Sequence, residues 1–262
     1  MRPTSILDDI VEDTRRRVAF ERTVRPFPDV IDGSRIRPRR TGFPFSRNLE
    51  AEGMSFICEV KRASPSKGMI AQDFPYLEIA KEYESAGASA ISVLTEPRFF
   101  KGRDEYLEEI ADTVSVPVLR KDFVIDEYQI YRAKEMGASA VLLIAAVLDD
   151  RHLECYRSLA ESLGMDALVE AHTKDEVERA VSSGAGIIGV NNRDLSTFEV
   201  DIGNSLRLRD SIPDSVVAVS ESGISTREDI RRLSDAGYDA VLVGEAFMRS
   251  SDRKAMMESL KA

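Results

Sequence analysis

Short apolar runs alternate with longer amphipathic segments along most of the chain. The apolar runs are residues 56–61, 90–94, 116–120, 140–144, 166–169, 187–190, 216–220 and 240–243. Runs of this length, rich in Val, Ile and Leu, are typical of parallel strands that are covered on both faces. The segments between and after them predict helices near 73–86, 103–113, 126–136, 149–163, 174–183, 204–211, 225–236 and 252–261.

Glycines punctuate this alternation at regular intervals. Gly87, Gly137, Gly184 and Gly237 stand just before apolar runs, at separations of 50, 47 and 53 residues. Glycine readily adopts the left-handed conformation that ends a helix. The spacing therefore indicates an internal repeat of about 25 residues, which is one strand and one helix.

Eight such repeats predict an α/β protein with a closed (β/α)8 barrel, the TIM-barrel architecture. An open, doubly wound sheet is the alternative fold. It would more often carry a glycine-rich dinucleotide turn after its first strand, and no such turn follows residues 56–61. The barrel is therefore the favoured interpretation.

A helical extension is predicted ahead of the barrel. Ser5 can cap a helix whose apolar positions recur at helical spacing, namely Ile6, Leu7, Ile10, Val11, Thr14 and Val18. Proline and glycine then predict an irregular connector over residues 25–45, with a short helix near 45–51. We expect one domain over residues 1–262, with the extension at 1–50 and the barrel at 55–262.

The composition indicates a globular protein of the cytoplasm. Hydrophobic residues make up 43% of the chain, yet no apolar stretch approaches the ~20 residues of a membrane span. Cys58 and Cys155 are too few for a disulfide framework or a zinc site, and Cys58 is expected to be a buried free thiol.

The net charge of −10 is unevenly distributed. Residues 1–47 carry 11 Arg and 7 acidic residues, whereas residues 48–262 carry 25 basic and 39 acidic residues. A nucleic-acid site at Arg35, Arg37, Arg39 and Arg40 is disfavoured, because the remainder is acidic and no aromatic platform accompanies them. A solvated connector that packs against the acidic body is expected instead.

Polar residues stand at the carboxyl ends of several predicted strands. They are Glu59, Lys61, Lys121, Glu170, Asn191 and Glu221. In a closed barrel these ends meet at one mouth, although the residues are far apart in sequence. Burying charged groups is costly unless they are paired or used, so this placement indicates an active site.

The chemistry of this set is that of lysine and glutamate. His152 falls on a predicted helix and is expected at the surface. His172 follows the fifth strand and can approach the mouth, but a catalytic base is the less favoured interpretation. General acid–base catalysis would then fall to Lys and Glu, with pKa values set by burial and neighbours. No His or Asp pair stands at ligand spacing on a strand end, so no metal is expected.

Two loops near the end of the chain suggest a phosphate site. Ser222 and Gly223 follow the seventh strand, and Gly244 and Glu245 follow the eighth. In many barrels these two loops bind phosphate through backbone N–H groups and a helix N-terminus. The Glu245 carboxylate would repel phosphate, so we expect only its N–H to face the ligand, with the side chain turned to solvent or a lysine.

Several segments together resemble indole-3-glycerol-phosphate synthase of tryptophan biosynthesis. In order and spacing they are CEVKRASPSKG, LRKDF, LVEAH, GVNNRDL, SESGIS and VGEAFM. The resemblance covers essentially the whole chain, including the helical extension. It implies conversion of 1-(2-carboxyphenylamino)-1-deoxyribulose 5-phosphate into indole-3-glycerol phosphate, carbon dioxide and water, with no cofactor.

The same resemblance implies a role for each polar residue of the mouth. Lys121 matches the acid that protonates the ketone, and Lys61 matches the cation that holds the substrate carboxylate. Glu170 matches the base that removes the ring proton, while the acid for dehydration is left open. Glu59 resembles a residue that orients the lysines.

Further matches concern substrate binding. Asn191 and Glu221 resemble ligands of the substrate hydroxyls and amine, and Ser64, Arg193 and Ser222 match other mouth residues, Arg193 as a second carboxylate anchor. Phe100, Phe123 and Leu142 match the lining of the slot for the aromatic ring. Some members of the family place a Trp from the N-terminal helix against this slot. This chain has no Trp, and Ile6 or Leu7 would take its place.

The expected partner is therefore a small phosphorylated substrate, with no nucleic acid and no membrane. The oligomeric state stays open, a monomer included, as do contacts with other enzymes of the tryptophan pathway. Rival functions are phosphoribosylanthranilate isomerase, a Schiff-base aldolase using Lys121, and a non-catalytic sensor of phosphorylated ligands. The isomerase would be expected to use a Cys–Asp pair, and no cysteine stands at a matching strand end.

Overall fold

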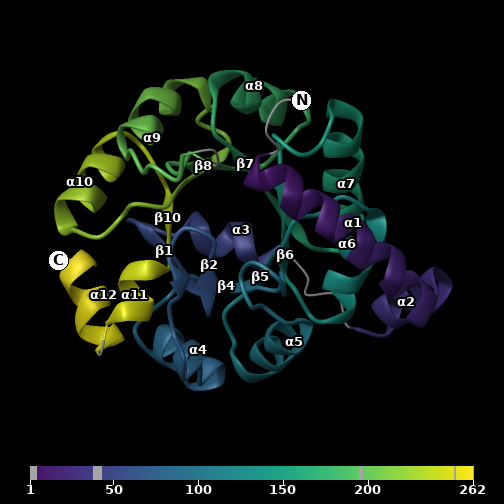
Figure 1. Cartoon of the computed structure of the whole chain (residues 1–262). Coiled ribbons are helices and arrows are strands. Elements are labelled where there is room, and N and C mark those ends of the chain that lie inside the picture. The colour runs from purple at the N-terminus through teal and green to yellow at the C-terminus, as the bar shows by residue number, and fades with distance from the viewer. Residues whose placement is uncertain (1–4, 38–42, 195–196, 251, 262) are drawn as a thin grey trace.

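The computed structural model describes residues 5–37, 43–194, 197–250 and 252–261. Within these residues eight parallel strands close into a barrel in the order β1-β10-β9-β8-β7-β6-β5-β4 (Figure 1). The strands are β1 (Ser55–Val60), β4 (Ala90–Leu94), β5 (Val118–Lys121), β6 (Ala140–Ile144), β7 (Asp166–Ala171), β8 (Ile187–Asn191), β9 (Val217–Glu221) and β10 (Ala240–Val243). The predicted barrel is thus confirmed, and the open sheet is excluded.

Helices surround the barrel, and all but the short helix α11 (Glu245–Arg249) agree with the predicted segments to within a few residues. They are α4 (Tyr76–Ser85), α5 (Asp104–Thr113), α6 (Glu127–Glu135), α7 (Asp150–Ser162), α8 (Lys174–Ser182), α9 (Gly203–Leu208) with the 3-10 turn η1 (Arg209–Ser211), α10 (Arg227–Asp235), α11 (Glu245–Arg249) and α12 (Arg253–Lys261). The repeat glycines Gly87, Gly137, Gly184 and Gly237 have φ values of 87°, 87°, 79° and 89°. They end their helices in the left-handed conformation that the sequence predicted.

Every barrel strand except the end of β5 is fully buried, which explains the continuous apolar runs. Because side chains alternate, each strand contributes to two apolar layers. Ile57, Leu119 and Leu168 pack inside the barrel. Val60 and Val93 pack outward under the helices. The polar strand-end residues continue the inward-facing layer toward the mouth.

The N-terminal extension contains α1 (Ile6–Val24), α2 (Phe27–Ile36) and α3 (Pro44–Leu49). Ser5 caps α1, with reciprocal hydrogen bonds to Asp8. The irregular connector predicted for residues 25–45 is wrong over α2. Pro28 lies in the first turn of α2, where a proline is tolerated because that N–H has no partner in the helix. Val30 is fully buried beside Tyr128 of α6, and this packing holds the helix.

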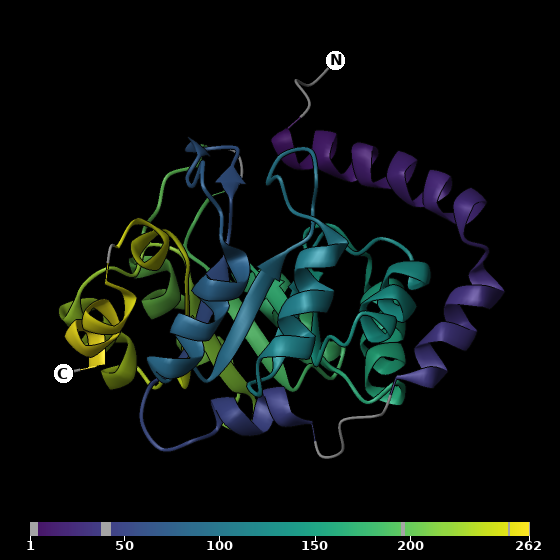
Figure 2. The same ribbon diagram turned by 90° about the horizontal axis from the view of Figure 1, so that it is seen from below.

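The two ends of the barrel are covered differently (Figure 2). At one end α3 inserts Phe45 and Leu49 into the inner apolar layer. At the other end lie α1 and a hairpin formed by β2 (Ala63–Ser64) and β3 (Gly68–Met69). The strands finish at this second end, so the extension closes the bottom of the barrel and also reaches its mouth.

Candidate active site

A cavity of about 760 Å³ opens at the mouth of the barrel. All residues predicted for the site line it, namely Glu59, Lys61, Ser64, Phe100, Lys121, Phe123, Leu142, Glu170, Asn191, Arg193, Glu221, Ser222, Gly223, Gly244 and Glu245. They come from all eight barrel strands or from the loops that follow them. The structure therefore brings the whole predicted set together in one place.

Lys121 lies between two buried carboxylates at the centre of the cavity. Its Nζ donates hydrogen bonds to Glu170 Oε2 at 3.1 Å and to Glu221 Oε2 at 3.2 Å. Burial lowers the pKa of Lys121, but the negative charges of Glu170, Glu221 and Glu59 outweigh it and leave the pKa above its usual value. Lys121 is therefore a charged proton donor at neutral pH.

The two carboxylates that share Lys121 have opposite pKa shifts. For Glu170, burial raises the pKa, but the charges of Lys121 and His172 outweigh it and lower the pKa to about 2. For Glu221, burial dominates and, with the negative charge of Glu170, raises the pKa to about 7. Among the described residues Glu221 Oε1 has no hydrogen-bond partner, which agrees with a carboxyl that is partly neutral.

Glycine makes room for Glu221 in the barrel. A Cβ atom added at Gly189, on the neighbouring strand β8, would collide with Glu221 Oε1. A second glycine serves Glu59 in the same way, since a Cβ at Gly244 would lie 2.5 Å from Glu59 Oε1. These glycines therefore allow charged side chains to lie against backbone inside the mouth.

Glu59 and Lys61 form a second ion pair on β1 and the residue that follows it. Lys61 Nζ lies 2.5 Å from Glu59 Oε1, so the two side chains share a face as the alternation predicted. The Glu59 side chain is only 4% exposed, whereas that of Lys61 is 16% exposed. Glu59 thus fixes the ammonium group of Lys61 at the edge of the cavity.

His172 lies behind Glu170 and does not line the cavity. Its Nε2 is 3.6 Å from Glu170 Oε1, and its Nδ1 is 3.4 Å from Glu176 Oε2. Burial lowers the pKa of His172, but the two carboxylates outweigh it and raise the pKa above its usual value. His172 therefore contributes positive charge near Glu170 and lowers the pKa of that group.

The two glycine-bearing loops are adjacent at the mouth and have distinct backbone conformations. Ser222 has φ of 69° and Gly223 has φ of 82°. Asn192 holds this turn, because its Nδ2 donates to the Ser222 carbonyl oxygen at 3.0 Å. A left-handed serine is unusual, and such conformations are found where neighbouring groups impose them.

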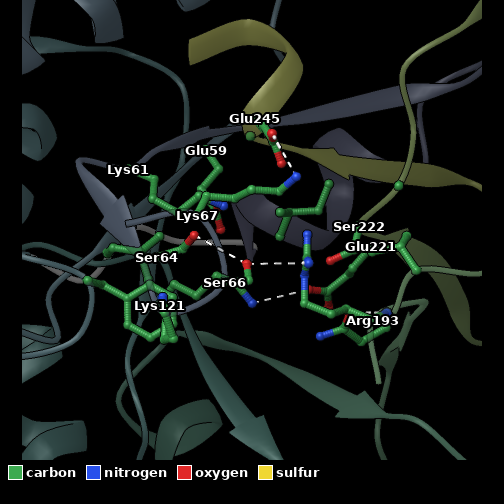
Figure 3. Close-up of a pocket in the computed structure, with 18 of the residues that line it drawn as sticks. Glu59, Lys61, Ser64, Ser66, Lys67, Lys121, Arg193, Glu221, Ser222 and Glu245 are labelled. Carbon is green, nitrogen blue, oxygen red and sulfur yellow. Dashed lines mark hydrogen bonds and ion pairs between the residues drawn. The ribbon is translucent and has the colours of Figure 1, made fainter. Parts of the chain in front are cut away.

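The side chain of Glu245 is neutralised by two cations. Its Oε1 lies 3.1 Å from Arg249 Nε and 3.6 Å from Lys67 Nζ (Figure 3). The carboxylate is thus turned toward a lysine, as the sequence predicted. Its backbone N–H begins α11, a helix of only five residues.

Aromatic and aliphatic side chains form the apolar wall of the cavity. The ring centroids of Phe100 and Phe123 are 6.1 Å apart. Phe123 also packs on the inner apolar layer, which includes Leu142. Ile6, Leu7 and Ile10 of α1 line the same cavity. Aliphatic residues of α1 therefore lie at the wall where some members of the resembled family place a Trp.

Several lining residues were not predicted, among them the polar residues Ser66, Lys67 and Arg249. Ser66 Oγ lies 3.5 Å from Arg193 Nη1 and 3.5 Å from Ser64 Oγ, so the hairpin contacts the β8 loop across the mouth (Figure 3). Ser66 and Lys67 belong to the same segment as Lys61 and Ser64. The sequence does not reveal the hairpin that turns their side chains inward.

Other expectations concern residues outside the cavity. His152 is half exposed, as predicted, with its Nδ1 2.8 Å from Asp149 Oδ1. Cys58 is buried, as predicted, and burial raises the pKa of its thiol. Arg37 forms an ion pair with Asp112 of α5, which agrees with a connector packed on the acidic body. Arg39 and Arg40 lie outside the described residues.

The described residues contain neither a metal cluster nor a membrane-spanning helix. No group of His, Cys, Asp or Glu side chains in this part of the chain is arranged to hold a metal ion. No helix in the same part is both long and apolar enough to span a bilayer.

Comparison with known proteins places the chain in a family. The family model for indole-3-glycerol phosphate synthase matches residues 7–260. The indole-3-glycerol phosphate synthase of Lacticaseibacillus paracasei is 52% identical over 256 residues, or 98% of each chain. The enzyme of the same name from Ruminiclostridium cellulolyticum is 50% identical over 256 residues, also 98% of each chain.

A solved structure provides a more distant comparison. That of 3-hexulose-6-phosphate synthase superposes with a TM-score of 0.66 at 15% identity, over 79% of this chain and 98% of that chain. This likeness shows the fold alone. The family match and the close relatives go further, and the chain therefore belongs to the indole-3-glycerol phosphate synthase family, whose members are carboxy-lyases of tryptophan biosynthesis.

Proposed function

We propose that the chain closes the indole ring of 1-(2-carboxyphenylamino)-1-deoxyribulose 5-phosphate, with loss of carbon dioxide and water, by Lys/Glu general acid–base catalysis. The observation that carries the proposal is the position of Lys121. Its charged ammonium is buried between two carboxylates, one with a lowered pKa and one with a raised pKa. Carboxyl groups whose pKa values are pushed apart are suited to opposite proton-transfer roles.

Ring closure requires an acid at the ketone. The ring carbon that bears the carboxylate attacks the ketone carbon, and the ketone oxygen gains negative charge. Lys121 donates a proton to that oxygen, and Glu170 and Glu221 keep the ammonium in place before the reaction. The product of this step is an alcohol on a ring that has lost its aromaticity.

Decarboxylation then restores aromaticity as the carbon–carbon bond to the carboxylate breaks. Lys61 holds this carboxylate, and Glu59 orients Lys61 through their ion pair. Arg193 is a second anchor, supported by its position at the rim beside Ser66. Ser64 lines the same rim and contacts Ser66. The ring itself occupies the slot of Phe100, Phe123 and Leu142.

Dehydration requires the hydroxyl to leave as water and a base to remove a proton from the adjacent carbon. Glu170 is the base, since its lowered pKa keeps it ionised at neutral pH. Glu221 and Asn191 bind the substrate amine and hydroxyls. With a pKa of about 7, Glu221 retains a proton on part of the molecules and can donate a hydrogen bond to the leaving hydroxyl.

The substrate phosphate binds at the β9 and β10 loops. The proposed ligands are the hydroxyl of Ser222 and the backbone N–H groups of Gly223, Gly244 and Glu245. Lys67 and Arg249 support this assignment, because they neutralise the Glu245 carboxylate that would otherwise repel the anion. The phosphate and the aromatic ring thus lie on opposite sides of Lys121.

The test is turnover of the named substrate by the purified chain. Indole formation is followed by ultraviolet absorbance or fluorescence, and carbon dioxide is measured in parallel. We expect one carbon dioxide per indole-3-glycerol phosphate, without added metal or cofactor. Trapping by borohydride with loss of activity would instead indicate a Schiff-base aldolase. Binding of the substrate without turnover would indicate a sensor.

A further inference from the structure

The helix α1 is anchored to the active-site mouth by a buried ion pair. Arg17 Nη2 donates to Asp122 Oδ1 at 2.7 Å, and Arg17 Nη1 donates to Asp122 Oδ2 at 3.0 Å. The side chains are 14% and 0% exposed. A buried bidentate pair of this kind has a defined geometry, unlike the exposed pair of neighbouring Arg16 with Glu12.

Asp122 directly follows Lys121 and orients the chain around it. Asp122 Oδ1 also accepts a hydrogen bond from the backbone N–H of Phe123 at 2.8 Å. Its Oδ2 accepts from Thr95 Oγ1 at 2.9 Å and from Arg120 Nη2 at 3.2 Å. The carboxylate therefore fixes the backbone between the proposed acid and one ring of the aromatic slot.

The same helix contributes directly to the aromatic side of the cavity. Ile6, Leu7 and Ile10 in its first turns line the cavity. Asp13, one turn before Arg17, lies 2.6 Å from Arg98, close in sequence to Phe100. Figure 2 shows α1 lying along the end of the barrel that carries the mouth. Contacts of α1 thus reach both segments that supply the aromatic rings of the slot.

From these contacts we propose that Arg17 is a positioning residue for the aromatic half of the substrate. It acts through Asp122, which holds Phe123 and Lys121, and it keeps the aliphatic wall of α1 over the slot. Arg17 touches neither substrate nor phosphate in this proposal. The inference rests on the proposed function, because it assumes that the slot binds the anthranilate ring.

The location of the pair gives the proposal a specific signature. Arg17 and Asp122 lie beside β5, whereas the proposed phosphate ligands lie on the loops after β9 and β10. A loss of the pair should therefore weaken binding of the aromatic half and leave phosphate binding intact. A purely stabilising ion pair would not distinguish the two halves of one ligand.

The test compares Arg17→Met with Arg16→Met, which removes the exposed neighbouring arginine. Two dissociation constants are measured for each protein, one for a substrate analogue with its ketone reduced to an alcohol and one for inorganic phosphate. We expect Arg17→Met to weaken binding of the analogue by about 10-fold, which corresponds to about 1.4 kcal/mol. Phosphate affinity should stay at the parent value, and Arg16→Met should match the parent for both ligands.

Arg17→Lys provides rescue, because one charged hydrogen bond to Asp122 remains available, and we expect an intermediate affinity for the analogue. Asp122 keeps Arg120 as a partner in each variant, and circular dichroism checks the fold. If Arg17→Met loses affinity for both ligands equally, or for neither, the proposal is overturned. Failure of the proposed function is distinguished by a separate measurement, since the parent protein would then not turn over the substrate.

Discussion

Replacing Lys121 by methionine tests the central residue of the site. Methionine keeps much of the length and volume of the side chain but removes the ammonium that contacts Glu170 and Glu221. Loss of a general acid typically costs ~100- to 10,000-fold in rate, or about 3–5 kcal/mol of barrier. The structure places the expected loss toward the upper end. Without Lys121 the Glu170 carboxylate also loses the ammonium that lowers its pKa and serves as its ion-pair partner, so the base is perturbed as well.

The fold should survive this substitution. Removing one partner of a buried ion pair costs about 3–5 kcal/mol when the other charge remains. Here the cost is reduced, because Glu221 has a pKa of about 7 and can take up a proton near neutral pH. A modest decrease in the midpoint of thermal unfolding is therefore expected, with an unchanged circular dichroism spectrum.

The assay is indole formation under single-turnover conditions, with two comparison variants. Lys174→Met removes an exposed lysine that pairs only loosely with Glu178, and it should behave as the parent. The double variant Lys121→Met, Glu221→Gln removes the carboxylate repulsion but supplies no acid. It should regain stability without regaining activity. Turnover of Lys121→Met within about threefold of the parent would refute the acid role, given the cost cited above.

Three further predictions address the neighbouring residues. Glu170→Gln should slow indole formation but not carbon dioxide release in single-turnover experiments, because an amide cannot accept the ring proton; slowed decarboxylation alone would contradict the late-step role. The Glu221 carboxyl should be neutral below about pH 7 and ionised above it, so an infrared band of a protonated carboxyl should titrate there and be absent in Glu221→Gln. A band that persists in Glu221→Gln belongs to another group. Gly244→Ala should raise KM and lower kcat, because its Cβ displaces Glu59, whereas Gly186→Ala, with no described atom within 4 Å of its Cβ, should leave both unchanged.

Much of the barrel could be predicted because its signals are local. Each apolar run is short and covered on both faces, so its composition alone indicates a buried parallel strand. Gly87 and Gly137 mark helix ends because a left-handed residue is needed there. Glu59 and Lys61 could be assigned to one face because strand side chains alternate. Convergence at the mouth then followed from the geometry of a closed barrel.

The features that the sequence did not predict depend on contacts between distant segments. Pro26, Pro28 and Gly33 are residue types that usually interrupt a helix. The helix α2 nevertheless forms, because Val30 packs against α6 and because proline is tolerated in a first helical turn. A Cβ at Gly33 would contact the Glu135 side chain, which would have to shift. The pairing of Arg17 with Asp122 joins residues 105 positions apart and has no local signal.

The two glutamates that contact Lys121 show most clearly where sequence reasoning ends. Glu170 and Glu221 are the same residue type. They lie near the carboxyl ends of β7 and β9, the two strands that flank β8, and both are nearly inaccessible to solvent. Their pKa values differ because of what surrounds them. Glu170 has His172 behind it as well as Lys121 in front, so its charged form is favoured. Glu221 has an oxygen with no described hydrogen-bond partner, so its neutral form is favoured. The neighbours of each carboxylate thus decide that Glu170 acts as the base and that Glu221 retains a proton. A substitution at His172, which does not line the cavity, should therefore raise the pKa of Glu170 toward that of Glu221.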